Sequence, residues 1–353
     1  MPTAPRTIRE QLEADEEAVL SPYAQKSRAS LGRDVPEPPD PVRPIFQHDR
    51  DRIIHSKAFR RLAGKTQVFL APEGDHYRTR ITHTLEVAQI ARTVTRALRL
   101  NESLTEAIVM GHDLGHTPFG HAGEKVLAKL MPDGFHHVKQ SLRVVEVLER
   151  EGRGLNLSRE VRDGILKHSK GKGHIISDNP NLLAMTLEGQ IVRISDIVAY
   201  VNHDLDDAVR GRVIDPGDVP RGILATLGAR HGDRIARMVH DMVGASRLDE
   251  KRQIRMSDEI LGALIALRDY LYEAVYERAE IRGEFEKAQR IISELWAYFH
   301  GHGDEFRAKH WPKGVPESDG LSRAIADFIT GMTDRYALRV YEEYFLPRRW
   351  PVY

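Results

Sequence analysis

The spacing of apolar residues constrains the fold more than any other feature of this sequence. Ile191, Ile194 and Val198 are followed at the same spacing by Val201 and Leu205. Residues three and four positions apart lie on one face of an α-helix. Similar spacing recurs in three further segments, at Leu85, Ala88, Ala91 and Val94, at Leu142, Val145 and Leu148, and at Ile260, Leu264, Leu267, Leu271 and Val275. The pattern predicts a protein made of many helices.

Signals for β-strands are weak in comparison. Residues 66–70 and 173–176 are the only short candidates, and neither alternates apolar and polar residues over a useful length. Residues 171–180 and 301–320 are rich in Gly, Pro, Asp and Lys, which predicts loops. We therefore predict an all-α fold, built as a multi-helix bundle.

A run of prolines sets the N-terminal segment apart. Proline fixes φ and lacks a backbone donor, which disfavours a regular helix and favours extended chain. We therefore expect residues 1–44 to form a proline-rich arm, because prolines occupy positions 36, 38, 39, 41 and 44. Residues 45–210 are expected to form the core that carries the functional site. Residues 211–353 are expected to form a C-terminal helical region packed on the same domain.

The overall charge gives no attraction to nucleic acid or to an anionic membrane, because 52 Lys and Arg balance 52 Asp and Glu. An anionic substrate must therefore be bound by locally placed cations. Cysteine is absent, which excludes disulfides and thiolate metal sites and agrees with a reducing cytoplasm. No apolar run approaches the roughly 18 residues of a membrane span, and residues 1–17 lack an apolar signal segment. We expect a cytoplasmic protein that does not enter a membrane.

Histidines are concentrated in one part of the chain. Of the 17 histidines, five lie between residues 112 and 137. His112 and Asp113 are adjacent near the end of a helix predicted at 104–114, where Gly115 can stop the helix. Thr117 can then cap the next helix, with Pro118 in its first turn. This corner would place His116 at the turn, and His121 one helical turn before Glu124.

Two flanking segments offer further metal ligands. His83 begins one predicted helix, and Asp196 is embedded among apolar residues of another, where a carboxylate needs a partner to offset burial. A His-Asp dipeptide alone is common, and a lone Asp in an apolar helix is more often salt-bridged. The order of His83, then His112 with Asp113, then Asp196 is much harder to explain by chance.

That order resembles the HD superfamily of metal phosphohydrolases. Within it, the sequence from about Asp49 to Tyr344 is similar to the deoxyguanosine triphosphate triphosphohydrolases of the shorter bacterial type. The segments that carry the resemblance are 51–62, 65–69, 78–84, 112–124, 140–141, 188–192, 202–207 and 331–336. The resemblance implies an HD-domain bundle that hydrolyses dGTP or other dNTPs to deoxynucleoside and inorganic triphosphate.

The resemblance also implies roles for individual residues. His83, His112, Asp113 and Asp196 would hold a divalent cation, and ligands of this mixed kind do not distinguish Mn, Mg, Co, Fe, Ni or Zn. His121 and Glu124 correspond to the catalytic couple, with His116 beside them. Substrate contacts would come from Arg80 at the α-phosphate, from Gln67, Tyr200 and Asp204 at the sugar, and from His137 and Lys139 near the phosphates. Candidates for contacts to the base are Arg268, Tyr272, Asp334 and Tyr336.

Several alternatives stay open. The chain has His136-His137-Val-Lys where relatives often have Glu-His-Asn before Gln140, which leaves the role of His137 undecided. Another HD phosphohydrolase, acting on nucleoside monophosphates, cyclic nucleotides or alarmones, is one rival. A catalytically silent regulator that binds nucleotide or nucleic acid is another. The resemblance further implies a homo-oligomer and an effector, either a nucleotide or single-stranded DNA.

Overall fold

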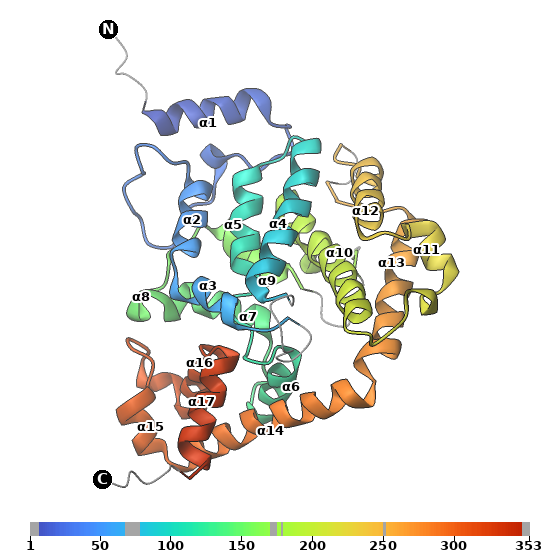
Figure 1. Cartoon of the computed structure of the whole chain (residues 1–353). Coiled ribbons are helices and arrows are strands. Elements are labelled where there is room, and N and C mark those ends of the chain that lie inside the picture. The colour runs from blue at the N-terminus through green and yellow to red at the C-terminus, as the bar shows by residue number, and fades with distance from the viewer. Residues whose placement is uncertain (1–6, 68–77, 170–174, 178, 250–251, 348–353) are drawn as a thin grey trace, which may run out of the picture. The chain divides into compact units, whose positions relative to one another are not determined.

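A computed structural model describes residues 7–67, 78–169, 175–177, 179–249 and 252–347 (Figure 1). Regular structure in these residues is helical throughout, with isolated bridges at Thr66–Thr79 and Arg247–Gln253 and no β-strand. The predicted all-α fold is confirmed. None of the described helices combines the length and the apolar character that crossing a bilayer requires.

The chain forms two compact units, and each is assembled from three separate segments. The first unit contains Met1–His55, His83–Asp113 and Asn156–Arg278. The second contains Ser56–Thr82, Leu114–Leu155 and Ala279–Tyr353. The division into an arm, a core and a C-terminal region, inferred from the sequence, stays a prediction.

The first unit is built around helix α5 (Glu102–His112), which packs against α2 (Ile45–Ile54), α9 (Arg159–Lys167) and α10 (Leu187–Arg210). α10 also packs against α12 (His231–Ala245) and α13 (Asp258–Leu271), and α11 (Arg221–Leu227) packs against both of them. The other helices of this unit are α1 (Ile8–Val19), η1 (Ser27–Ala29), most of α4 (Arg80–Ala97), η4 (Pro180–Leu182), η5 (Pro216–Asp218), α11 (Arg221–Leu227), α12 (His231–Ala245), α13 (Asp258–Leu271) and η6 (Tyr272–Tyr276).

The predicted apolar face of α10 is confirmed, because its five residues from Ile191 to Leu205 are all buried. Close approach of α5 and α9 depends on two glycines. A Cβ at Gly111 would lie 2.4 Å from the Ile165 side chain, and one at Gly164 would lie 2.5 Å from Ile108. Larger residues at either position would therefore force α5 away from its neighbour.

The second unit is built around the long helix α14 (Ala279–Gly301), which packs against α6 (His121–Leu130), α15 (Gly303–His310), α16 (Leu321–Thr330) and α17 (Asp334–Phe345). Its apolar core includes Leu127, Ile292, Trp296, Phe299 and Ile325. The remaining helices are α3 (Lys57–Arg61), η2 (Leu62–Gly64), α7 (His137–Arg143), η3 (Val144–Leu148), α8 (Glu149–Gly152) and η7 (Glu317–Asp319).

The structure corrects three predictions. Extended chain is wrong for Ile8–Val19, where α1 begins with a reciprocal cap between Thr7 and Glu10 ahead of the prolines. A loop at 301–320 is wrong for α15, which buries Phe306 and has acidic residues in its first turn and basic residues in its last. Leu85 does not lie on the buried face of α4, since it is 54% exposed. The strand candidates at 66–70 and 173–176 lie partly outside the described residues.

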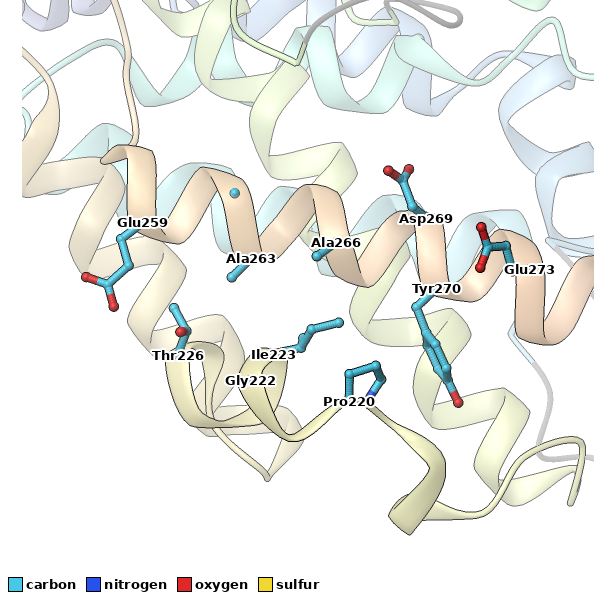
Figure 2. Close-up of a pocket in the computed structure, with 11 residues that line it drawn as sticks. Pro220, Gly222, Ile223, Thr226, Glu259, Ala263, Ala266, Asp269, Tyr270 and Glu273 are labelled. Atoms are coloured by element: carbon cyan, nitrogen blue, oxygen red, sulfur yellow. The ribbon is translucent and has the colours of Figure 1, made fainter.

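A hollow of about 590 Å³ lies between α11 and α13 of the first unit (Figure 2). Small residues such as Gly222, Gly262 and Ala266 are among those that line it, and none of the predicted site residues lines it. Its charged lining residues are the carboxylates Glu259, Asp269 and Glu273. Carboxylates repel phosphates, so this hollow is a poor candidate for a nucleotide site.

Candidate metal centre and histidine–glutamate cluster

Three helices of the first unit bring the four predicted metal ligands together. α4 supplies His83, α5 supplies His112 with Asp113 directly after it, and α10 supplies Asp196. His83 Nε2 lies 3.0 Å from Asp196 Oδ1, and His112 Nε2 lies 3.6 Å from Asp113 Oδ1 and 3.8 Å from Asp196 Oδ1. Donor atoms of His83, His112 and Asp113 all lie within 4.8 Å of one another, and these three residues are buried. The group could therefore hold a metal ion.

The protonation of His112 supports this interpretation. Its Nδ1 lies 2.6 Å from the carbonyl oxygen of Val109, which can only accept a hydrogen bond, so the proton of the neutral ring is on Nδ1. Nε2 then carries a lone pair that faces the carboxylates of Asp113 and Asp196. A buried lone pair and two carboxylates repel one another unless a cation lies between them. The donor set therefore fits a divalent cation.

Asp196 is ionised in this surrounding. Burial by itself would raise its pKa, but the hydrogen bond with His83 holds the pKa below its usual range. An ionised carboxylate is the form that binds a cation.

A fifth residue of this centre, His168, was missed by the sequence analysis. It follows α9, is buried, and its Nδ1 lies 2.7 Å from the carbonyl oxygen of Ile165. Its Nε2 is 3.9 Å from Asp113 Oδ1, and its ring meets that of His112 edge-on at 5.0 Å. The sequence held no signal for it, because His168 lies 55 positions after Asp113 and outside the histidine-rich segment.

The predicted sugar-binding residues Tyr200 and Asp204 follow Asp196 on α10, one and two turns along. Asp204 is buried and accepts a hydrogen bond from the hydroxyl of Tyr276, which also contacts the Tyr200 side chain. Burial and the neighbouring Asp204 raise the pKa of both tyrosines above the ordinary value, so both hydroxyls keep their protons. Tyr276 was not predicted. Its position four residues after Tyr272 was the only available signal.

The corner after the His112-Asp113 pair differs from the prediction. α5 ends at His112 with Asp113 as its C-cap, and the next helix, α6, begins only at His121. Thr117 does not cap α6, because its hydroxyl donates to the carbonyl of Gly120, which itself is the N-cap with φ +53°. The chain takes this path because Phe119 is buried in the second unit and its N–H donates to the carboxylate of Asp334.

A second cluster of titratable residues lies in the second unit, around Glu124. His137 Nδ1 lies 2.9 Å from Glu124 Oε1, and His121 Nδ1 lies 3.7 Å from Glu124 Oε2. Burial would raise the pKa of Glu124, but His121 and His137 hold it well below its usual range. Since the side chain of His121 is 65% exposed, the cluster pairs a carboxylate with an imidazole that solvent can reach.

His116 belongs to the same unit and stacks on His137, with ring centroids 4.1 Å apart and planes inclined by 15°. Its backbone is held by Lys65, a buried cation whose Nζ donates to the carbonyls of His116 and Thr330. Lys65 belongs to a segment that carries the family resemblance, but the sequence did not predict this role for it. Gly115 permits the corner, because a Cβ there would lie 2.1 Å from the Ser141 backbone nitrogen.

The predicted phosphate and sugar contacts Arg80 and Gln67 also belong to the second unit. A Cβ at Gly120 would lie 3.1 Å from a guanidinium nitrogen of Arg80 and 3.2 Å from the carbonyl oxygen of Gln67, so glycine lets the three segments approach closely. The Oε1 atom of Gln67 is buried without a hydrogen-bond partner in the described part of the chain. Lys139, the other predicted phosphate contact, is exposed.

The four residues suggested for base contacts divide between the units. In the first, Arg268 pairs with Asp269, and Tyr272 is 53% exposed. In the second, Tyr336 packs against the apolar core, and the Asp334 carboxylate accepts hydrogen bonds from Thr66 and Phe119. These bonds give Asp334 a structural role.

Two protein-family models match this chain. The HD domain model matches residues 80–201, and the phosphohydrolase-associated domain model matches residues 254–343. A deoxyguanosinetriphosphate triphosphohydrolase-like protein of Caldanaerobacter subterraneus is 56% identical over 343 residues, which cover 97% of each chain.

Two further relatives carry the same name. The protein of Desulfatibacillum aliphaticivorans is 51% identical and covers 97% of this chain and 99% of its own. That of Clostridium tetani is 41% identical and covers 97% of each chain. This chain therefore belongs to the deoxyguanosinetriphosphate triphosphohydrolase-like family of HD-domain phosphohydrolases.

Proposed function

We propose that this protein is a metal-dependent hydrolase that splits dGTP or other dNTPs into deoxynucleoside and inorganic triphosphate. The observation that carries the proposal is that the buried residues His83, His112 and Asp113 converge and that Asp196 lies beside both histidines. Relatives named deoxyguanosinetriphosphate triphosphohydrolase-like proteins match nearly the whole chain, which supports the same substrate class.

The cation would be held by His83 and His112 through Nε2 and by the carboxylates of Asp113 and Asp196. A bound divalent cation supplies an acidified water and neutralises charge on the attacked phosphate. Two carboxylates already balance the charge of a dication, so the triphosphate needs further cations from the chain. Arg80 is suited to this task, because a guanidinium can bind two phosphate oxygens at once. It lies one helical turn before His83 on α4.

His121 would handle the proton of the leaving group. Water attacks the α-phosphorus and loses one proton to solvent, and the bond to the 5′-oxygen breaks. His121 gives that oxygen a proton and is reprotonated from solvent, so deoxynucleoside leaves while triphosphate stays intact. Glu124 accepts from the imidazole and stabilises its cation, which suits proton transfer near neutral pH. His116 and His137, stacked on one another, would add positive charge or donors beside this couple.

Selection of deoxyribose would depend on Tyr200, Asp204 and Gln67. Asp204 can accept from the 3′-hydroxyl while Tyr276 holds its carboxylate in place. The Tyr200 ring would lie against C2′, where the extra hydroxyl of a ribonucleotide would clash. The same proposal includes a homo-oligomer and an effector, either nucleotide or single-stranded DNA, which light scattering and activity with each added effector would test.

The proposal is tested by incubating the protein with dGTP and Mn²⁺ or Mg²⁺ and separating the products by anion-exchange chromatography. We expect deoxyguanosine and triphosphate in equal amounts. Pyrophosphate or orthophosphate as the first product would identify a different phosphohydrolase, and no turnover with any dNTP, singly or in pairs, would favour a regulator. GTP in the same assay measures the discrimination against ribose.

A further inference from the structure

The buried residues behind the metal centre show how His83 is held. We infer that His203 and Glu86 form a relay that positions His83 and keeps the proton on its Nδ1, so that Nε2 is available to a cation. This inference rests on the proposed metal site. It assigns a function to two residues that neither the motif nor the proposed mechanism uses.

The relay consists of three side chains of the first unit. His83 and Glu86 lie one turn apart on α4, and His203 lies on α10. His83 Nδ1 is 3.4 Å from His203 Nδ1, and the two rings meet edge-on at 90° with centroids 5.5 Å apart. The other nitrogen of His203, Nε2, is paired with the carboxylate of Glu86.

The chemistry of these groups assigns each proton. The carboxylate of Glu86, which is paired with His203 Nε2, favours a proton on that nitrogen. The neutral His203 ring then has a lone pair on Nδ1, and it can only accept a hydrogen bond from Nδ1–H of His83. His83 Nε2 itself lies 3.0 Å from Asp196 Oδ1, and a cation bound to the lone pair of Nε2 would leave the ring proton on Nδ1. His203 therefore offers a hydrogen-bond acceptor to the tautomer of His83 that coordination through Nε2 requires.

His112 achieves the same result by simpler means. Its Nδ1 hydrogen bond goes to the carbonyl of Val109 in its own helix, and a backbone carbonyl can never donate. His83 Nδ1 faces a second histidine, whose proton arrangement has to be fixed in turn. Glu86 supplies this second fixation, because its carboxylate pairs with His203 Nε2, although the Glu86 side chain is 39% exposed.

Outer partners of this kind matter for affinity as well as orientation. Hydrogen bonding to the distal nitrogen of a ligating histidine fixes its tautomer and raises its basicity, and loss of the partner typically costs about 10- to 100-fold in metal affinity. Both His83 and His203 are buried, so water cannot readily replace a lost partner. The His231 ring, whose plane is inclined by 16° to that of His203 at 6.1 Å, further limits its movement.

The test measures Mn²⁺ binding to the full-length protein without nucleotide, from the electron paramagnetic resonance signal of free Mn²⁺. His203→Leu removes the acceptor and should raise the Kd for Mn²⁺ by about 10- to 100-fold. His203→Asn places an amide oxygen near the position of Nδ1 and should restore most of the affinity. Glu86→Ala should weaken binding by a smaller factor than His203→Leu, and Glu86→Gln, which retains an acceptor, should weaken it least.

Asn202→Ala is the matched control. Asn202 is the buried neighbour of His203 on α10, and its side chain bonds to Arg234 and to the carbonyl of Val198. Its loss should lower the unfolding temperature without changing the Kd. If His203→Leu does not fold, the paired comparison of Glu86→Ala with Glu86→Gln decides the question.

The possible outcomes separate the two proposals. Failure of the wild-type protein to bind Mn²⁺ would refute the metal site of the proposed function. Tight binding by wild type, with an unchanged Kd in folded His203→Leu or in Glu86→Ala, would overturn the relay alone. Equal weakening by His203→Leu and His203→Asn would also contradict it, because a hydrogen-bond acceptor would then have no effect.

Discussion

The two histidine clusters of this protein use the same residue types, but the second includes an imidazole that solvent reaches. In the first unit, His83, His112 and Asp113 are buried, and His112 Nδ1 bonds to a backbone carbonyl. In the second unit, Glu124 is flanked by His137 and by His121, whose side chain is 65% exposed.

The difference teaches that burial and hydrogen bonding decide the chemistry of an imidazole. A buried ring whose Nδ1 proton is fixed presents a lone pair of constant direction, which suits a metal ligand. A ring near solvent and beside a carboxylate can gain and lose its proton, which suits acid–base catalysis. Substitutions in either cluster should therefore separate metal binding from proton transfer, and substitutions of nearby buried groups should test how burial and hydrogen bonds control both.

The largest effect is expected for Asp196→Asn. Removing one negative charge from the buried cluster should abolish measurable Mn²⁺ binding and lower turnover of dGTP by roughly 1000-fold or more, since the cation contributes several kcal/mol to the reaction. Binding and turnover are measured on the same preparation. Asp206→Asn, on the same helix but paired with Arg210, serves as the control and should behave like wild type. Retained activity in Asp196→Asn would refute the assignment.

His121→Asn should separate catalysis from metal binding. Loss of the proton donor is expected to lower kcat by roughly 100- to 10,000-fold, while the Kd for Mn²⁺ stays unchanged. Lys125→Ala, an exposed change on the same helix, should have no effect on either quantity. The comparison of the two clusters would fail if His121→Asn weakened metal binding as strongly as it weakened turnover.

Glu188→Gln tests burial of a carboxyl group that faces backbone donors. Glu188 accepts from the N–H groups of Gln25 and Asn101, and burial raises its pKa from 4.5 to about 7. Since the folded state binds the proton more tightly, stability is greatest below pH 4.5 and falls as the pH rises to about 7. The loss is at most about 3 kcal/mol.

Gln mimics the protonated group and keeps its carbonyl acceptor. The free energy of unfolding of Glu188→Gln relative to wild type should therefore rise between pH 5 and pH 8, as measured by urea denaturation of metal-free protein. Parallel pH dependences for the two proteins would show that Glu188 does not titrate in this range.

The smallest effect is expected for Tyr276→Phe. Losing one hydrogen bond to Asp204 should raise KM for dGTP by about 2- to 10-fold, with less change in kcat, because the bond orients a sugar contact and takes no part in proton transfer. Tyr270→Phe, at a residue of α13 that lines the hollow between α11 and α13, is the control. Equal KM values for wild type and Tyr276→Phe would remove Tyr276 from the site.

Most of the fold could be predicted because α10 and α13 carry long apolar faces of helical period. The errors fall where tertiary contacts override local signals. Thr117 has the right type and position for a cap, yet the path of the chain is set by burial of Phe119 and by the Asp334 carboxylate, 215 residues later. α15 was missed because this short helix buries a single residue, Phe306, so its sequence has no repeated apolar spacing.

The sequence by itself determined the all-α class, the family and the identity of the residues that could hold a cation. It could do so because helical period and short motifs are local properties of the chain. Only the tertiary structure decided which nitrogen of His112 is free, that His168 faces Asp113, and that His203 and Glu86 lie behind His83. Those relations depend on contacts between residues distant in the chain, and such contacts fix the proton positions on which metal binding depends.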